Sequence, residues 1–133
     1  MTKTIITYAI TLIAFVAIDL VWLGWLARAT YMAEMGDLLR KQPDLVAAVI
    51  FYLVYAAGLM FFAISPGLKS GSLIQTVALA AALGFVAYGT YDLTNLSVLN
   101  GFSVKIAVID LIWGTCLSAM ASAVTFILVL KLT

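Results

Sequence analysis

Four long apolar runs limit what this chain can fold into. They cover residues 5–27, 45–64, 73–99 and 104–130, and each reaches the roughly 20 residues that an α-helix needs to cross the hydrocarbon layer of a bilayer. Of the 133 residues, 65% are hydrophobic and only 10% are charged, which is more apolar surface than a small water-soluble core could bury. The sequence therefore predicts an all-α, polytopic membrane protein with four transmembrane helices in a single domain.

The connections between these runs differ in length. Residues 28–44, RATYMAEMGDLLRKQPD, hold many of the charges, and we interpret them as an interfacial loop that ends at Asp44, a helix N-cap. Serine, proline and glycine in 65–72 predict a break in the helix. An Asn-Gly turn at 100–101 leads to Ser103, which can cap the fourth helix. Short connections of this kind predict an up-down bundle with both chain ends on one side.

Basic residues are divided almost evenly between the two sides of the predicted bundle. The side with the chain ends carries three, Lys3, Lys69 and Lys131, and the other side carries four, Arg28, Arg40, Lys41 and Lys105. The positive-inside rule depends on an excess at the cytoplasmic face. The sequence therefore does not choose a membrane orientation.

The residue types also exclude several classes of function. The chain has no histidine and one cysteine, Cys116, so it lacks the usual ligands of zinc, copper, haem and iron–sulfur clusters and cannot form an internal disulfide. Its net charge is +1 and it contains no basic run or glycine-rich phosphate loop. We therefore expect no metal, no cofactor and no nucleic-acid partner.

Three aspartates lie inside the apolar runs, at ends that share one side of an antiparallel bundle. Asp19 and Asp110 occur in two copies of an I-D-L-x-W sequence, and Asp92 lies near the end of the third run. We expect Asp19 and Asp110 to face each other at one depth. An ionised carboxylate inside a bilayer costs at least about 2.5 to 3.5 kcal/mol, and no lysine or arginine occurs at that depth. At least one of the three is therefore expected to be protonated near pH 7.

Aromatic residues accompany these aspartates at helical spacing. In the third run, two tyrosines, an aspartate and an asparagine recur at i, i+3, i+4 and i+7, which places them on one helix face. A tryptophan follows each I-D-L aspartate by three residues, and two tyrosines lie one turn apart in the second run. The predicted binding and proton-titrating site consists of Asp19, Asp92, Asp110, Asn95, Tyr88, Tyr91, Trp22, Trp113, Tyr52 and Tyr55.

Both groups of residues also have a purely structural interpretation. Tyrosine and tryptophan form belts at membrane interfaces without binding anything, and acids bonded to neighbouring hydroxyls can simply hold helices together. A stripe of small residues in the fourth run, Gly114, Ser118 and Ser122, predicts a close-packing seam for another helix, and a homodimer is one expected use of it.

Three sequence stretches, IDLVWLGW, YGTYDLTNLS and VIDLIWG, resemble those of a family of small four-helix bacterial membrane proteins known as domain of unknown function 2177. The resemblance extends over nearly the whole chain. It implies a multi-pass protein of the bacterial inner membrane, and it supplies no activity.

Three functions are compatible with these observations. An acidic pocket with aromatic walls suits binding or transport of a small hydrophobic or cationic molecule, with possible coupling to protons. Paired acids also suit a metal-free enzyme that acts on a lipid or isoprenoid. The third alternative is an accessory or assembly subunit of a membrane complex. Membrane lipids are expected partners whichever function applies. We rank binding or transport first.

Overall fold

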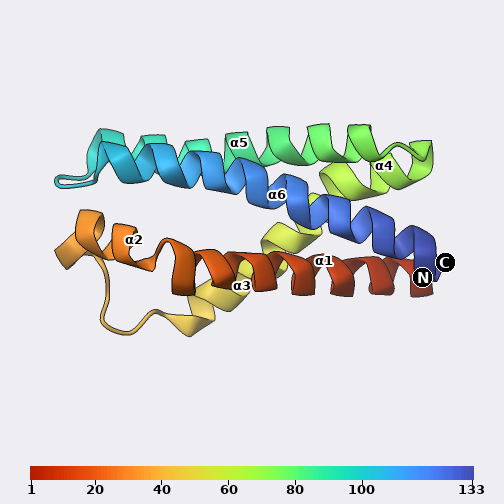
Figure 1. Cartoon of the computed structure of the whole chain (residues 1–133), viewed down its shortest axis with the longest axis horizontal. Coiled ribbons are helices and arrows are strands. Elements are labelled where there is room, and N and C mark those ends of the chain that lie inside the picture. Colours follow the sequence, from red (N-terminus) through yellow and green to blue (C-terminus); the bar gives the residue numbers. More distant parts are fainter.

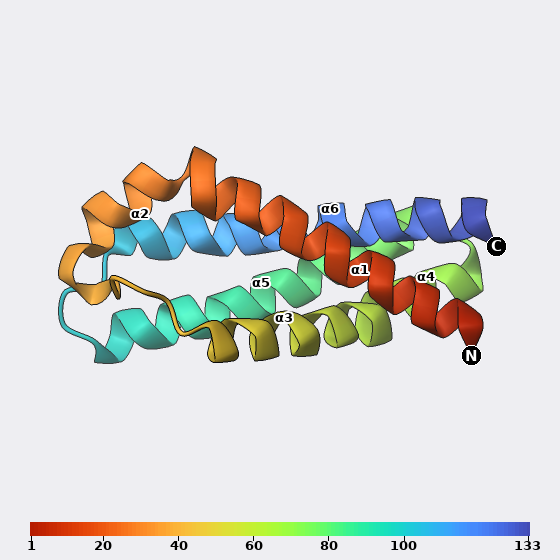
Figure 2. The same ribbon diagram turned by 90° about the horizontal axis from the view of Figure 1, so that it is seen from below.

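The computed structural model describes all 133 residues, and helices joined by turns make up the chain (Figure 1). Four helical segments are long and apolar enough to cross a membrane: Thr2–Leu26, Leu45–Ser70, Leu73–Val98 and Val104–Leu132. They alternate in direction, and both termini lie at the same end of the molecule (Figures 1 and 2). The chain is an all-α, multi-pass membrane protein with an up-down arrangement of four helices, as predicted.

Two of the four segments combine regular α-helix with a π-helical turn. The elements in chain order are α1 (Thr2–Val21), a π-helical turn (Trp22–Leu26), α2 (Arg28–Met35), a 3₁₀ turn (Gly36–Leu38), α3 (Leu45–Leu59), a second π-helical turn (Met60–Ile64), α4 (Ser65–Ser70), α5 (Leu73–Val98) and α6 (Val104–Leu132).

Side-chain caps begin the helices where the sequence predicts them. The Asp44 carboxylate accepts a hydrogen bond from the backbone N–H of Ala47 at 3.1 Å, and the Ser103 hydroxyl accepts one from Ile106 at the same distance. Gly101 has a φ of 80°, which glycine adopts without steric cost. The tight turn between α5 and α6 is therefore confirmed.

The predicted helix break at residues 65–72 is wrong over most of its length. The second segment continues through Ser65–Ser70 as α4 and ends at Gly71, which has a φ of 70°. Proline lacks an N–H and its ring collides with the carbonyl four residues earlier. The π-helical turn Met60–Ile64 precedes Pro66 and widens the helix at that point, so the chain passes the proline without leaving the helix.

The stripe of small residues on α6 packs against α5 of the same chain. A Cβ atom at Gly84 on α5 would lie 2.5 Å from the carbonyl oxygen of Gly114 and 2.6 Å from the Ser118 hydroxyl. Ser118 and Ser122 are completely buried. The predicted packing seam exists, but it is formed within one chain. Gly114, Ser118 and Ser122 are therefore not available for the homodimer contact that the sequence suggested, because this surface is already buried.

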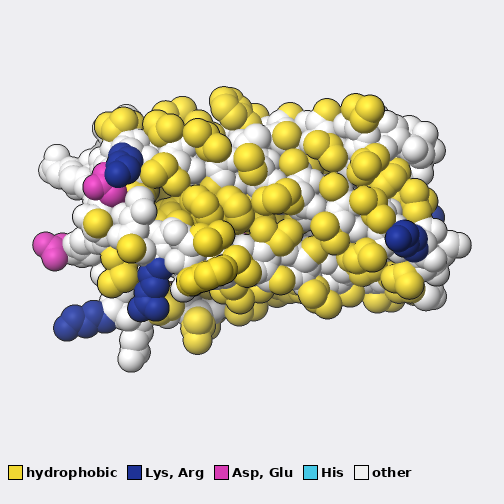
Figure 3. Space-filling model, viewed as in Figure 1, with side chains coloured by type: hydrophobic (Ala, Val, Ile, Leu, Met, Phe, Trp, Pro, Cys, Tyr) yellow, Lys and Arg dark blue, Asp and Glu magenta, His cyan; other side chains and the backbone are white.

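On the face shown in Figure 3, charged side chains lie at the two ends of the molecule, and hydrophobic side chains cover most of the band between them. This distribution matches a bundle whose lateral surface faces hydrocarbon and whose ends face water and headgroups. The α2 helix and the 3₁₀ turn occupy the end opposite the termini.

We predict that Gly84→Ala lowers the free energy of unfolding by about 1–3 kcal/mol, because its methyl group would collide with the backbone of α6. Gly58→Ala is the matched control, since no atom lies within 4 Å of a Cβ there and alanine favours a helix over glycine. Unfolding of both variants in one detergent tests this. Equal stability of the two variants would contradict the close α5–α6 contact.

Candidate functional site

Asp19 joins three transmembrane helices through its carboxylate. It lies near the end of α1 with 4% of its surface exposed. Its Oδ2 accepts a hydrogen bond from the Tyr52 hydroxyl of α3 at 2.7 Å, and its Oδ1 accepts one from the Trp113 Nε1 of α6 at 3.0 Å. Both carboxylate oxygens therefore have a donor, which offsets the cost of burying this group.

Asp110, on α6, has a different set of contacts. Its Oδ1 accepts a hydrogen bond from the Tyr31 hydroxyl at 2.9 Å, and the same hydroxyl accepts one from Trp22 Nε1 at 3.3 Å. Its Oδ2 receives no hydrogen bond from the protein. Asp110 therefore keeps one oxygen free for another partner.

In each I-D-L-x-W copy, the tryptophan is linked by hydrogen bonds to the aspartate of the other copy. Trp113, from the α6 copy, bonds to Asp19 of the α1 copy, and Trp22 reaches Asp110 through Tyr31. The two indole rings stack, with centroids 4.4 Å apart and planes 9° from parallel. The repeated sequence thus links the end of the first transmembrane segment to α6, and both aspartates line the same pocket.

Tyr31 is the main site residue that the sequence analysis missed. It lies on α2, within the segment interpreted as an interfacial loop. The α2 helix lies beside α6, where Tyr31 and Met35 pack against Phe102 and Ile106, and Glu34 accepts a hydrogen bond from Ser103 at 3.0 Å. Burial, and then the nearby Asp110 carboxylate, raise the pKa of the Tyr31 hydroxyl above its ordinary value, so it remains a donor at neutral pH.

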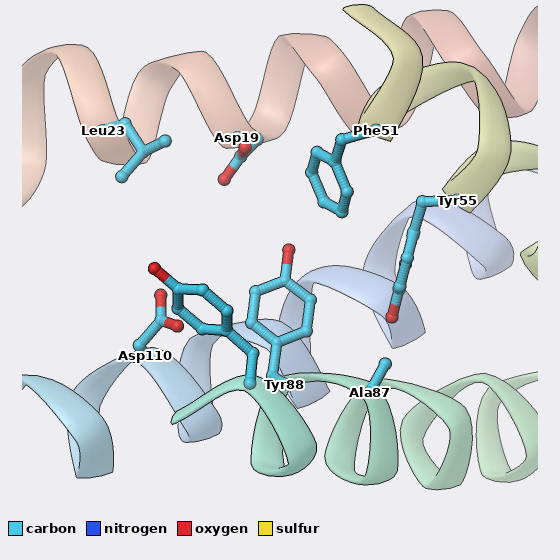
Figure 4. A pocket seen from close by; sticks show the side chains of 8 residues that line it. Asp19, Leu23, Phe51, Tyr55, Ala87, Tyr88 and Asp110 are labelled. Carbon is cyan, nitrogen blue, oxygen red and sulfur yellow. The ribbon is translucent and has the colours of Figure 1, made fainter. Parts of the chain in front are cut away.

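A pocket of about 410 Å³ opens beside these aspartates, and we refer to it as the aspartate pocket (Figure 4). All four transmembrane segments contribute to it. Its lining residues are Asp19, Leu23, Phe51, Tyr55, Ala87, Tyr88, Tyr91 and Asp110.

Contacts with residues of α6 fix the positions of the aromatic side chains that line the aspartate pocket. The Tyr88 ring lies over Gly114, where any larger residue would collide with it, and its hydroxyl points toward Asp19 (Figure 4). Tyr55 meets Tyr88 edge to face, with centroids 5.9 Å apart, and shares a hydrogen bond of 2.8 Å with Ser118. The shape of the wall therefore depends on small residues of α6.

The aspartate pocket reaches the outer surface between α3 and α5. Within the second segment, α5 packs mainly against the π-helical turn Met60–Ile64 and has few contacts with α3. Phe51 of α3 is 41% exposed and Tyr91 of α5 is 55% exposed. The aspartate pocket is therefore open at the lateral surface of the bundle, beside Phe51 and Tyr91.

Asp92 is close to the aspartate pocket but does not line it. It is 1% exposed, neither of its oxygens has a hydrogen-bond donor, and its carboxyl group interacts with that of Asp110. Two adjacent carboxyls without a donor between them need a proton to form a hydrogen bond.

The structure thus places the predicted residues in different roles. Asp19, Asp110, Tyr55, Tyr88 and Tyr91 line the aspartate pocket. Tyr52, Trp22 and Trp113 support its carboxylates from outside the cavity. Asp92 lies behind Asp110, and Asn95 neither lines the pocket nor bonds to a carboxyl group. The sequence analysis also missed Leu23, Phe51 and Ala87, which carry no polar group that would mark them. No three acidic, cysteine or histidine side chains are arranged to hold a metal ion.

We predict that Trp113→Phe lowers the free energy of unfolding by about 1–3 kcal/mol, because Asp19 Oδ1 would remain buried without its donor. Trp25→Phe makes the same chemical change at a side chain that is 76% exposed, and it should leave stability within about 0.5 kcal/mol of wild type. Unfolding in a single detergent compares the two. If Trp113→Phe were as stable as Trp25→Phe, the bond to Asp19 would have no structural role.

Comparison with curated proteins found no match, and comparison with solved structures found none either. A protein family does match the chain over residues 4–127, which is nearly its whole length. This chain belongs to that family, which is described as "Predicted membrane protein (DUF2177)".

Proposed function

We propose that this protein binds and transports a small hydrophobic cation, such as an amine with an apolar body, in the inner membrane of a bacterium. The free Oδ2 of Asp110 carries this proposal, because it borders an aromatic pocket that opens toward lipid. The bacterial membrane is what the resemblance of the three sequence motifs implies.

The charges around the aspartate pocket favour a cationic ligand. No lysine or arginine lines the cavity, and the only ion pair in the chain, Arg40 with Asp44, lies in the connecting loop. Asp19 already has two donors, whereas Asp110 has one. A ligand cation would supply the countercharge that a carboxylate in a low-dielectric site requires.

The aromatic lining favours the same class of ligand. Phe51, Tyr55, Tyr88 and Tyr91 offer ring surfaces to the cavity, and a cation held over such a ring gains about 0.5–2 kcal/mol. The volume of about 410 Å³ falls within the range of about 300–1,000 Å³ that is typical of small-molecule sites. The opening between α3 and α5 allows an apolar molecule to enter from the bilayer.

Asp92 supports coupling of this binding to a proton. One proton shared between Asp92 and Asp110 would give the buried Asp92 the hydrogen bond that it otherwise lacks. A cation at Asp110 competes with that proton, so binding should release it and affinity should rise with pH. The other titratable groups near Asp110 are Asp19, Tyr31, Tyr88 and Tyr91, and none of them is basic.

The same pair of carboxyls favours a second candidate, an acid–base enzyme acting on a lipid or isoprenoid. A protonated carboxyl can donate to a double bond while an ionised one accepts a proton from a neighbouring carbon, which moves the double bond without a cofactor. The lipid-side opening suits such a substrate. This candidate requires product to form from a lipid extract, and product should be lost in Asp92→Asn.

Binding of tetraphenylphosphonium, a hydrophobic cation whose charge does not change with pH, tests the first candidate. We expect wild type to bind it, with affinity higher at about pH 8 than at about pH 6, because fewer protons then compete for the carboxyls. Asp110→Asn should weaken binding at least about tenfold, or about 1.4 kcal/mol. Titration calorimetry in detergent micelles measures both effects.

Two controls separate charge recognition from general hydrophobic binding. Asp37→Asn removes the same charge from an exposed position outside the aspartate pocket and should bind like wild type. Tetraphenylborate has the same shape and the opposite charge, and it should not bind. Equal binding of the two ions, or unchanged affinity in Asp110→Asn, would contradict the proposal. If neither ion binds and the Asp→Asn variants differ only in stability, the accessory-subunit interpretation is favoured.

A further inference from the structure

A second pocket lies at the opposite end of the molecule, next to the termini. It has a volume of about 250 Å³, and α1, the second π-helical turn and α4 form it. We refer to it as the lysine pocket, and its lining residues are Lys3, Thr4, Thr7, Met60, Ser65, Leu68 and Lys69.

The polar groups of the lysine pocket are mainly donors without partners in the protein. Lys3 and Lys69 make no salt bridge, and the hydroxyls of Thr4 and Ser65 make no hydrogen bond within the chain. The Thr7 hydroxyl is already used, since it donates to the carbonyl oxygen of Lys3 at 2.7 Å. Two ammonium groups and two free hydroxyls thus converge on one cavity.

No acidic side chain lies at this end of the protein. All six aspartates and glutamates belong to the other half: Asp19, Glu34, Asp37, Asp44, Asp92 and Asp110. The view in Figure 3 shows acidic and basic side chains together at the end with the long loop, and basic side chains alone at the end with the termini. The positive charge of the lysine pocket therefore has no countercharge from neighbouring side chains.

We propose that the lysine pocket binds the phosphate headgroup of an anionic phospholipid. The two ammonium groups would contact the phosphate oxygens, and the hydroxyls of Thr4 and Ser65 would donate to them. Basic pockets between transmembrane helices at the membrane surface recognise such headgroups. This site is separate from the aspartate pocket, with which it shares no lining residue.

The surroundings of the lysine pocket favour a lipid over a free phosphate ion. Met60 and Leu68 add apolar surface to the lining, which a small hydrated anion would not use but the glycerol and upper acyl chain of a lipid would. Ile5, directly after Thr4, is 62% exposed on the lipid-facing surface, so acyl chains can continue along α1.

Native mass spectrometry with phosphatidylglycerol and phosphatidylcholine of identical acyl chains tests this proposal. Wild type should retain phosphatidylglycerol at least about fivefold more than phosphatidylcholine, because only the former carries a net negative charge. The double variant Lys3→Gln/Lys69→Gln should lose that preference. Lys131→Gln is the matched control, since it removes a lysine from the same end but outside the lysine pocket.

Three results would overturn the proposal. The first is that the double variant retains as much phosphatidylglycerol as wild type. The second is that Lys131→Gln loses as much phosphatidylglycerol as the double variant does. The third is that wild type shows no preference for phosphatidylglycerol. A separate experiment adds inorganic phosphate at millimolar concentration to the protein–lipid complex. The phosphate should not displace the lipid. If inorganic phosphate binds and the lipid does not, the lysine pocket is an anion site and the lipid assignment is wrong. The melting temperature of the double variant verifies that it is folded.

Discussion

The buried carboxylate of Asp19 is the constraint on which the arrangement of the helices depends. Asp19 is almost completely shielded from solvent by the surrounding helices, and this chain supplies no cation near it. Its two oxygens therefore require donors from other helices, and Tyr52 of α3 and Trp113 of α6 provide them. Satisfying one residue of α1 fixes the depth and rotation of two further helices. The stacked indoles of Trp22 and Trp113 then connect this contact to the Tyr31 hydroxyl that bonds to the second aspartate, Asp110.

This arrangement leaves the two central aspartates chemically different although their local sequences match. Each oxygen of Asp19 has a donor and the residue is 4% exposed, so it acts mainly as a structural anchor. Asp110 has one donor and a free oxygen at the aspartate pocket, and Asp92 lies behind it without a donor. The difference arises from the neighbours. Asp19 has direct donors on two transmembrane helices, whereas Asp110 depends on Tyr31 of the short helix α2.

Much of this site could be predicted from sequence because helical periodicity and antiparallel topology are strong constraints in a bilayer. They predict a common depth for Asp19, Asp92 and Asp110 without any knowledge of side-chain contacts. Tyr31 could not be found in the same way, because its position depends on how α2 packs onto α6. Helical spacing also cannot tell which residues on one helix face line a pocket. Tyr88 lines the aspartate pocket, whereas Asn95, seven positions later on the same predicted face, does not. The helix through Pro66 was missed because a π-helical turn accommodates the proline.

Native mass spectrometry of the protein extracted gently from its own membrane is the most direct test of the central claim, that Asp110 holds a ligand in the aspartate pocket. We expect wild type to carry an additional mass matching a hydrophobic amine or quaternary ammonium compound. Asp110→Asn should lose that mass, and Lys3→Gln/Lys69→Gln should keep it. A wild-type protein without any such mass, or a mass that persists in Asp110→Asn, would contradict the claim.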